Sequence, residues 1–514
     1  MRDLLDRQLG RVTMYRLVTI ALALLVVVMI AYTAVGTFTE PFTVKGQLLT
    51  LAVLLVASYV SNRLLGLAWR IRPHTESSVI TALLLFFMFW PSTKLDDLVW
   101  LGTTAVLANA TKYVLAWRGR HVLNPAAAGA VLAVVLQDLF GRDLSINATW
   151  WIGSEKLLPF VALGVFLVLW RTRRLAVGLL FVLIAGLLTV IGLLDSGGTF
   201  KAAVEAAAYS SPIVFMAGFM VTEPLTLPPR RWQQLVVGAV MGSLVAWPLF
   251  APVLGIEPLT VGPLFVSPEV SLVVGNLVAF ALARRRGVSL VLEKSRALTP
   301  ETRELTFRAK RPLTFEPGQY AELTVPHAGV DGRGSRRSFS ISSPPSPDGR
   351  LSFALRVPEK SSSFKKALLA LEPGDTVHAT GIGGDFIWPA DRAVPLLLVA
   401  GGIGITPFLS QLRHESFRDA VVVYGVSSAD EVPFVEELAG IRVVLVGPGR
   451  PSALPQSWTY VEASILSAEL IADSVPDLAD RRAYISGPPA MVNAVRPGLA
   501  KRCKRIKTDY FTGY

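Results

Sequence analysis

The chain has 514 residues, 52% of them hydrophobic, and a mean hydropathy of +0.49, which argues against a purely soluble protein. Its net charge of +12 does not indicate nucleic acid binding, because most arginines of the first half flank apolar segments. Cys503 is the only cysteine, which excludes an internal disulfide and an iron–sulfur cluster held by four thiolates. No metal site is predicted.

Residues 1–286 contain long uncharged runs, and a helix that crosses a membrane needs about 20 mainly apolar residues. We therefore expect a polytopic helical membrane domain in contact with lipid. The first run has no small-residue cleavage pattern after it, so it is interpreted as a retained span. The ten spans that we expect lie near residues 17–36, 46–62, 77–92, 98–117, 122–137, 157–170, 175–194, 206–222, 232–254 and 265–283.

The basic residues between these spans predict the orientation of the protein. With the N-terminus inside, the inner segments carry seventeen Lys and Arg and the outer segments carry five. Because positive charge is retained on the inner side, we expect a multi-pass protein of the cell (inner) membrane. Its N-terminus and its soluble C-terminal part are predicted to be cytoplasmic.

Two groups of five spans would have opposite topology, and weak similarities between the groups fit an inverted repeat. Leu123–Ala126 begins the fifth span and Val266–Glu269 begins the tenth at a related position. Trp90–Ser92 and Glu223–Leu225 likewise end the third and eighth spans. Inverted repeats with interrupted helices place binding sites near the membrane midplane. The alternative is that two apolar helices are alike in composition alone.

The sequence from Ser289 onward is that of a soluble α/β protein, and Arg336–Ser343 is its first informative motif. The alternation predicts a strand that offers a cation for phosphates at Arg337, an aromatic plane at Phe339 and a small hydroxyl at Ser340. A flavin nucleotide needs these three groups. The alternative is a polar strand end before Pro344 and Pro345.

Three later segments extend this pattern. Ser361–Lys365 and Gly381–Phe386 are predicted loops whose hydroxyls, amides and one cation suit flavin phosphates. Pro395–Ala400 predicts a buried strand that enters the glycine turn Gly401–Pro407 and then a helix, where a pyrophosphate can approach the backbone. Ala483–Met491 predicts another strand that ends in a glycine turn at the same sheet edge.

In this order and spacing, the motifs resemble the ferredoxin–NADP reductase superfamily from Ser289 to Tyr514. The resemblance implies an FAD-binding β-barrel domain at 287–392 and an α/β NAD(P)-binding domain at 393–514. It implies catalytic roles for Ser340, Thr406 and Ser486, although Ser486 stands where many members have Cys and Phe339 where many have Tyr. The FAD-binding residues it implies are Arg337, Ser338, Phe339, Ser340, Ser363, Lys365, Gly384, Phe386 and Phe511, and the NAD(P)-binding residues are Gly401, Gly402, Gly404, Thr406, Gly487 and Pro488.

The C-terminal segment Asp509–Tyr514 resembles the aromatic tail that covers the flavin in some members of this superfamily. The alternative is a frayed terminus. The turn Val426–Asp430 has no arginine to bind a 2′-phosphate, which favours NADH slightly, although Ser427 and Ser428 could bond such a phosphate.

Three segments of the first half, Glu76–Thr81, Asn124–Gly129 and Met220–Thr226, resemble the flavin-carrying membrane subunits of the sodium-translocating NADH:quinone reductase and of the Rnf complex. The resemblance covers residues 10–285 and implies a transmembrane domain, 1–286, that carries flavin and conducts electrons. His74 and His121 are the only histidines in this half, and both lie near inner ends, so haem held by paired histidines at two depths is disfavoured. Flavin is the carrier that remains.

Lys112 is an ionisable residue inside the fourth span, so we expect it, with Asn124, at a membrane flavin. The alternative is that Lys112 extends to the inner face. The outer segment Asp143–Trp151 matches the family pattern at Asp143 and at Ala148–Thr149, which predicts FMN bound covalently to Thr149, although Ile146 and Asn147 replace small residues. Ser196–Thr199 is a competing segment. A further alternative is that Trp150 and Trp151 form an interfacial aromatic belt.

Together these expectations describe a membrane flavoenzyme that oxidises cytoplasmic NAD(P)H through FAD. Electrons would pass into or across the membrane, through FMN or another flavin, to a quinone or an extracytoplasmic acceptor. One alternative is a transporter or binding module for a flavin or small solute, tethered to a soluble NAD(P)H:flavin reductase. Another is a quinone reductase at the inner face whose electrons never cross.

Overall fold

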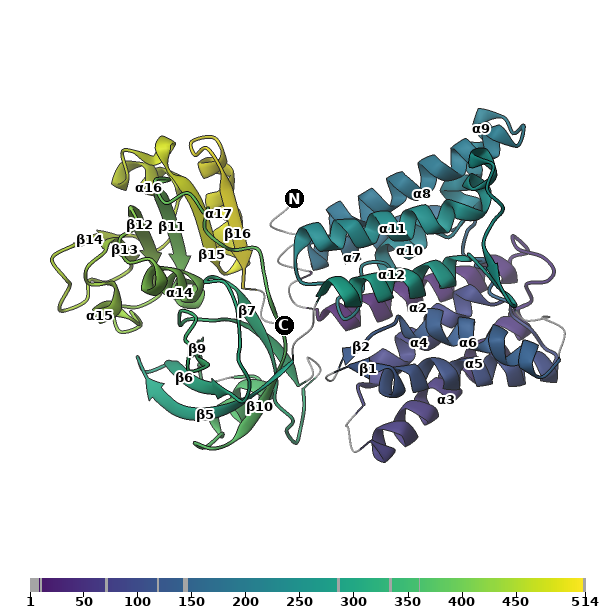
Figure 1. The fold of residues 1–514 in the computed structure, drawn as a ribbon, viewed down its shortest axis with the longest axis horizontal. Helices are drawn as coiled ribbons and strands as arrows, with labels where there is room; N and C mark the ends of the chain where they lie inside the picture. The colour runs from purple at the N-terminus through teal and green to yellow at the C-terminus, as the bar shows by residue number, and fades with distance from the viewer. Residues whose placement is uncertain are drawn as a thin grey trace. The chain divides into compact units, whose positions relative to one another are not determined.

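The computed structural model describes residues 9, 12–69, 73–117, 120–141, 147–283, 287–331, 335–359 and 361–511. It divides into two compact units, residues 12–284 and residues 285–514 together with 1–11. The first unit is built from helices, and the second from two sheets with helices packed against them (Figure 1).

The helical unit contains helices of two length classes, together with a π-helical turn η1 and two short hairpins. The longer helices and η1 are α2 (Met14–Ala34), α3 (Val44–Ala68), α5 (Leu95–Val114), α8 (Leu175–Asp195), α11 (Arg231–Phe250) and η1 (Ala206–Ser210). The shorter helices are α4 (Thr75–Met88), α6 (Pro125–Leu139), α7 (Leu158–Thr172), α9 (Phe200–Glu205), α10 (Ile213–Phe219) and α12 (Pro268–Ala283). The hairpins are β1 (Ala116–Trp117) with β2 (Arg120–His121), and β3 (Thr260–Val261) with β4 (Leu264–Phe265).

Among the described residues, five helical segments are long and apolar enough to cross a membrane: α2, α3, α8, α11 and the combined segment Phe200–Phe219. The apolar helices α4, α6, α7 and α12 are shorter, with 14, 15, 15 and 16 residues. The predicted ten spans are therefore supported only in part. The region is helical and apolar, but among the described residues five segments, not ten, are both long and apolar enough for a full span.

Two short helices of this unit, α4 and α6, each have terminal backbone groups bonded by a polar side chain at one end. Asn124 caps α6, because its side-chain oxygen accepts a hydrogen bond from Ala127 N at 3.2 Å, and Pro125 fits the first helical position. At the C-terminal end of α4, the Trp151 indole donates to the carbonyl oxygens of Phe86 and Phe89 at 2.9 and 2.7 Å. Such partners are needed wherever water cannot reach a helix terminus.

The second unit begins with an antiparallel sheet of order β8-β7-β10-β5-β6-β9, which encloses an apolar core that includes Leu290, Phe307 and Phe353. Its elements are β5 (Val288–Ala297), β6 (Thr302–Ala309), β7 (Tyr320–Thr324), β8 (Arg336–Ser340), β9 (Arg350–Arg356), α13 (Ser363–Leu369) and β10 (Thr376–Gly383).

The chain then forms a parallel sheet of order β14-β13-β12-β11-β15-β16 with buried residues on both faces. The strand order reverses between β11 and β15, and in such sheets ligands bind at the carboxyl ends of the strands at this switch point. Its strands are β11 (Leu396–Gly401), β12 (Ala420–Gly425), β13 (Arg442–Gly447), β14 (Trp458–Glu462), β15 (Arg482–Gly487) and β16 (Ile506–Tyr510). Its helices are η3 (Gly402–Ile405), α14 (Thr406–His414), α15 (Val435–Leu438), α16 (Ala468–Ser474), η4 (Leu478–Asp480) and α17 (Pro489–Ala500).

We expect Gly129→Ala to destabilise the helical unit. Gly129 lies where α6 crosses α5, and an added Cβ would lie 2.5 Å from the Cβ and 2.8 Å from the Cα of Ala108. Overpacking of this kind costs about 1–3 kcal/mol, so the melting temperature of the intact chain in detergent should fall. The control is Gly186→Ala in α8, where an added Cβ meets no atom within 4 Å. Equal melting temperatures for the two variants would contradict this packing.

Candidate functional site

The predicted glycines meet at the switch point of the parallel sheet. A Cβ on Gly404 would overlap the carbonyl oxygen of Ser486, and a Cβ on Gly401 would lie 2.5 Å from the sulfur of Met491. Gly402 has φ of +51°, in the left-handed region that favours glycine. Gly487 is packed against Gly401, since its added Cβ would lie 3.1 Å from Gly401 N. The structure thus brings together the residues predicted to lie along a nucleotide pyrophosphate.

Two of the predicted catalytic residues, Thr406 and Ser486, lie at this edge, and their hydroxyls differ in hydrogen bonding. Thr406 is buried, and its hydroxyl donates to the carbonyl oxygen of Ile403 at 3.0 Å, so it stabilises the turn itself. Ser486 is fully buried, and its hydroxyl has no hydrogen-bond partner among the described residues. Buried hydroxyls are normally bonded, and the role of Ser486 at the nicotinamide stays a prediction.

Sequence reasoning missed Asp509, which lies beside Ser486. The two residues are register partners in the parallel strands β15 and β16. Burial raises the pKa of the Asp509 carboxyl to about 6, and a backbone hydrogen bond from Tyr510 opposes this rise. The carboxyl therefore changes charge near neutral pH at the edge where the nicotinamide is expected. The only signal in the sequence was its place at the start of the aromatic tail.

The predicted cation Arg337 belongs to a polar cluster on the barrel. Its side chain is 8% exposed, its Nη2 lies 3.3 Å from Asp331 Oδ1, and its guanidinium lies 5.2 Å from the centre of the Phe364 ring. The Ser363 hydroxyl accepts a hydrogen bond from Asp331 N at 3.0 Å and lies 3.0 Å from His327 Nε2. The structure thus joins the predicted residues Arg337 and Ser363, and adds Asp331 and His327, which the sequence did not single out.

The other barrel residues predicted to bind FAD differ in their contacts and in their exposure to solvent. Phe339 stacks on Phe364 with ring centres 5.8 Å apart, and the Lys365 amine donates to the Arg356 carbonyl oxygen at 2.6 Å. Ser338 is exposed, whereas Ser340 is buried. Their contacts with FAD remain predictions.

Three further residues are predicted at the flavin. Gly384 and Phe386 lie where the barrel meets the parallel sheet, and Phe511 lies at the sheet edge. Gly384 has φ of +120°, and its added Cβ would lie 3.0 Å from the Tyr320 ring. The Phe386 ring is packed in the core of the α/β part against Tyr484, so core packing already accounts for it. Phe511 N donates to Gly487 O at 2.9 Å, so the tail is held at the sheet edge as far as this residue. Residues 512–514 lie outside the described part of the chain.

Helix α14 fixes the barrel relative to the glycine turn. The Ser410 hydroxyl donates to the carbonyl oxygen of Ser343 at 2.7 Å, and Arg413 Nη1 donates to Ser342 O at 3.0 Å. Gln411 Nε2 donates to Phe386 O at 2.7 Å. The segment that follows Ser340 is therefore attached to the helix that starts at the nucleotide turn. This attachment is what a hydride transfer between two bound cofactors requires.

In the helical unit, Asn124 belongs to a buried polar cluster. Its side-chain amide donates to Glu223 Oε2 at 3.0 Å, and the other oxygen of Glu223 lies 2.8 Å from His121 Nε2. Asn124 N donates to Asn276 Oδ1 at 2.7 Å. The side chain of Asn276 is fully buried, and its Nδ2 has no hydrogen-bond partner among the described residues.

Lys112 adjoins this cluster. Its amine donates to Ser77 O and to Asn109 Oδ1, both at 3.0 Å, and it interacts electrostatically with Glu223. The amine is thus bonded to α4 and α5 within the unit. The two residues predicted at a membrane flavin, Lys112 and Asn124, are accordingly linked through Glu223.

The predicted attachment residue Thr149 has an exposed side chain next to the end of α4, and its hydroxyl lies 3.4 Å from Met88 O. Trp150 and Trp151 are buried, with the Trp150 indole donating to Glu269 Oε2 at 2.8 Å, which does not match a lipid-facing aromatic belt. Asp143 and Ile146 lie outside the described residues. In the competing segment, the Thr199 hydroxyl caps α9 by accepting from Ala202 N at 3.3 Å.

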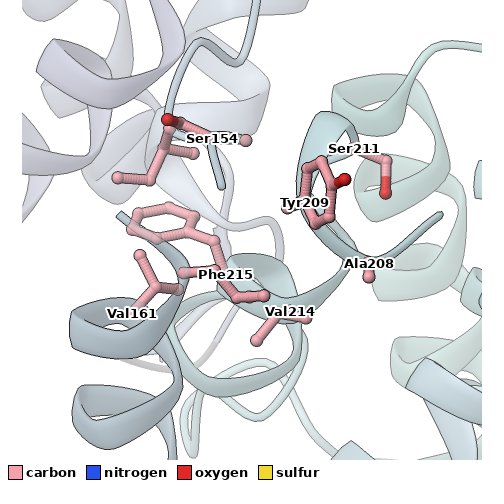
Figure 2. Close-up of a pocket in the computed structure, with 10 residues that line it drawn as sticks. Ser154, Val161, Ala208, Tyr209, Ser211, Val214 and Phe215 are labelled. Carbon is pink, nitrogen blue, oxygen red and sulfur yellow. The ribbon is translucent and has the colours of Figure 1, made fainter. Parts of the chain in front are cut away.

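A small hollow in the same unit is lined in part by Ile152, Gly153 and Ser154, which follow Trp151 in the chain. Figure 2 shows Ser154, Val161 and Phe215 near one side of it and Tyr209 and Ser211 near the other. Tyr209 lies in the π-helical turn η1, and single π-helical turns often occur at functional sites. Its lining combines Ser154, Tyr209, Ser211 and Phe215 with apolar side chains such as Ile152, Leu158 and Val161.

Comparison with known proteins yields matches for the C-terminal part. The family described as "Oxidoreductase NAD-binding domain" matches residues 398–497. The reductase subunit of an aromatic O-demethylase from Amycolatopsis sp. is 30% identical over 231 residues, which cover 41% of this chain and 65% of that protein. Ferredoxin--NADP reductase B from Sorangium cellulosum is 30% identical over 214 residues, which cover 38% of this chain and 80% of that protein.

Among solved structures, the Amycolatopsis cytochrome P450 reductase GcoB is 26% identical, with a TM-score of 0.36, and the match covers 44% of this chain and 71% of that chain. The chain spans less than two thirds of the length of the first of the curated relatives. The sequence matches confirm the predicted oxidoreductase and its NAD(P)-binding domain.

Proposed function

Because the chain belongs, through its C-terminal part, to the ferredoxin–NADP reductase family, we propose that it oxidises cytoplasmic NAD(P)H through FAD and passes the electrons into or across a membrane. The observation that carries this proposal is the meeting of Gly404, Ser486 and Asp509 at the switch point, joined through α14 to the barrel segment after Ser340. FAD, when bound, takes up a hydride and gives up electrons one at a time.

The residues of the sheet edge hold and orient the nicotinamide in this proposal. Gly401, Gly402 and Gly404 admit the pyrophosphate to the backbone, and Gly487 and Pro488 border it from β15. The buried Ser486 hydroxyl bonds the carboxamide, and Thr406 keeps the turn in shape. Ionised Asp509 stabilises the positive charge that grows on the nicotinamide as the hydride leaves.

The barrel holds FAD through Arg337, whose guanidinium binds the pyrophosphate. The buried guanidinium is held beside Asp331, which also contacts Ser363. Ser340 lies at the strand end that is joined to α14, where a hydroxyl can bond the flavin ring. The roles of Ser338, Phe339, Lys365, Gly384, Phe386 and Phe511 follow the family resemblance.

The helical unit then receives the electrons. We assign a further flavin to the cluster of Asn124, Glu223 and Asn276, with Lys112 as the nearby cation, and FMN to Thr149. The short helices α4, α6, α7 and α12 are, in this proposal, parts of the ten spans that begin or end within the bilayer. Because the hydrocarbon core is about 30 Å thick, a flavin at Thr149 needs an intermediate carrier to receive electrons from cytoplasmic FAD. The final acceptor is a quinone or an extracytoplasmic acceptor.

One observation favours a second candidate function. The unpartnered amide of Asn276 also suits a small solute with a carbonyl or anionic oxygen, so the helical unit could bind or transport a flavin or solute beside a soluble reductase. A quinone bound at the same cluster would make the protein an inner-face quinone reductase. The number of flavins bound per chain distinguishes these two functions from electron transfer across the membrane.

Arg337→Ala should empty the FAD site. Loss of a charge-assisted contact with phosphate costs about 1.5–3 kcal/mol, so FAD affinity should fall roughly ten- to a hundredfold. The measurement is FAD released per chain from purified intact protein, with titration of added FAD. The matched control is Arg336→Ala, next along the same strand, whose guanidinium lies 3.7 Å from Glu322 instead. Normal FAD retention by Arg337→Ala would overturn the assignment.

The rate of NADH oxidation should rise with pH through an apparent pKa near 6, because Asp509 is neutral below that pH and ionised above it. Asp509→Asn should abolish this step and lower the plateau about tenfold, equivalent to about 1.4 kcal/mol. The measurement is the pH profile of kcat with ferricyanide as electron acceptor. Asp473→Asn, at an exposed position of α16, serves as the control and should keep the step. An unchanged profile in Asp509→Asn would remove Asp509 from the reaction.

The intact chain, produced with the host's flavin-attaching enzyme, should carry more than one flavin, with FMN on the peptide that contains Thr149. Peptide mass spectrometry and acid extraction of flavins measure both. Thr149→Ala should lose only the covalent FMN, while Thr199→Ala should keep it. An unmodified Thr149 peptide, with FAD as the only extractable flavin, would reject the outer site and the transmembrane route together.

A further inference from the structure

The segment that connects the barrel to the parallel sheet, residues 384–387, is held by side chains along its backbone. It follows β10, which ends at Gly383. Each backbone carbonyl oxygen of the segment accepts a hydrogen bond from a side chain of another part of the unit. The donors are Gln319 to Gly384 O at 3.3 Å, Lys507 to Asp385 O and Ile387 O at 2.8 and 3.1 Å, Gln411 to Phe386 O at 2.7 Å and Tyr484 to Ile387 O at 3.0 Å. These bonds fix the path of the chain between its two sheets.

Lys507 makes two of these bonds from β16, the edge strand of the parallel sheet. A hydrogen bond donated by a charged amine is about twice as strong as one between neutral groups. The same ammonium lies 5.9 Å from the centre of the Tyr484 ring, and Lys507 and Tyr484 are register partners in β16 and β15. Lys507 therefore attaches the edge strand to the connecting segment, in addition to the pairing of the strand with β15.

The charged groups around the Lys507 amine come from three other parts of the unit. Burial has the largest effect on this amine and lowers its pKa below the usual value for lysine. Arg482 of β15 also lowers the pKa, whereas Asp385 of the connecting segment and Glu316, which precedes β7, act in the opposite direction. An amine withdrawn from water in this way needs hydrogen-bond partners within the protein, and the two carbonyl oxygens supply them.

Strand β16 also carries Asp509, two residues beyond Lys507. Side chains two positions apart on a strand point to the same face of the sheet, so Lys507 and Asp509 share a face. Asp509 is the register partner of Ser486, at the edge where the nicotinamide is expected. The connecting segment that Lys507 bonds begins at Gly384, which is predicted to bind FAD. Lys507 thus joins a segment predicted at one cofactor to the strand predicted at the other.

We propose that Lys507 is a positioning residue for hydride transfer from NAD(P)H to FAD. The inference rests on the proposed function, because it needs both cofactors at this sheet edge. In that transfer the C4–H bond of the nicotinamide breaks and its hydrogen moves, with both electrons of the bond, to N5 of FAD, so NAD(P)H is oxidised and FAD is reduced. Lys507 contacts neither reacting atom and acts by holding Asp509 and Gly384 at a fixed separation. A displacement of about 1 Å between reacting groups can lower a rate about a hundredfold.

Stopped-flow reduction of FAD tests this role in the intact, FAD-loaded chain, with NADH and NADPH each as donor. Lys507→Met keeps a long side chain but removes the ammonium, so the limiting rate constant should fall about ten- to a hundredfold while the nucleotide Kd changes little. Lys507→Arg should recover part of the loss, because a guanidinium also donates to carbonyl oxygens. The matched control is Lys504→Met, because the Lys504 side chain is 70% exposed and lies beside Asp480. This control should keep the wild-type rate constant.

Hydrogen exchange of the intact chain measures the same attachment without turnover. The backbone amides of β16 and of residues 384–387 should exchange faster in Lys507→Met than in the wild type, because the edge strand is then held by its pairing with β15 alone. The amides of β12, which lies between β11 and β13, should exchange at the wild-type rate. Unchanged exchange in β16 would reject the attachment.

An unchanged limiting rate constant in Lys507→Met would overturn the inference even if the melting temperature fell, because Lys507 would then serve stability alone. If Lys507→Met does not retain FAD, Lys507→Gln takes its place, with the same loss expected relative to Lys507→Arg. Failure of both nucleotides to reduce FAD bound to the wild-type chain would instead overturn the proposed function.

Discussion

The C-terminal site depends on one backbone contact, between Gly404 and the end of β15. A side chain at residue 404 would overlap the carbonyl oxygen of Ser486, so only glycine lets the turn after β11 lie directly against the neighbouring strand. Helix α14 starts from that turn. Three of its residues, Ser410, Gln411 and Arg413, then bond the barrel backbone. This contact therefore fixes the conformation of the nucleotide turn. Through helix α14 it also fixes the position of the barrel segment that begins at Ser340.

Much of this unit could be predicted because its signals are local. The run Leu396–Ala400 is buried at every position, as an uninterrupted apolar strand before glycines predicts. Residues whose role depends on strand pairing could not be found in this way. Asp509 lies beside Ser486 only because β16 pairs with β15. That register cannot be read from the sequence around either residue.

For Phe386, a local sequence pattern predicted a contact with the flavin, which stays a prediction, and the structure adds packing partners that the pattern did not indicate. The residue follows the glycine loop that suited flavin phosphates, but its ring packs against Phe408 and Tyr484. These partners come from α14 and β15, which lie far from it in the sequence. In the helical unit, composition predicted apolar helices correctly but not their lengths. An uncharged run does not reveal whether a helix crosses the whole bilayer or begins partway, because that depends on which distant residues satisfy its termini.

The helical unit satisfies those termini across the chain. The C-terminal carbonyls of α4 accept from Trp151, and the backbone amide of Asn124 at the start of α6 donates to Asn276 of α12. The first turn of α12 is bonded in turn, since Glu269 accepts from the Trp150 indole. Three of the short helices, α4, α6 and α12, are thus bonded near one end by a residue from another part of the sequence. Polar side chains therefore lie inside the unit beside the ends of these helices. Among the described residues, Asn276 Nδ2 is one of the buried groups without a hydrogen-bond partner, and the same side chain accepts from Asn124 N at the start of α6. The requirement for backbone partners in an apolar medium accounts both for the short helices and for the polar cluster that can hold a carrier between them.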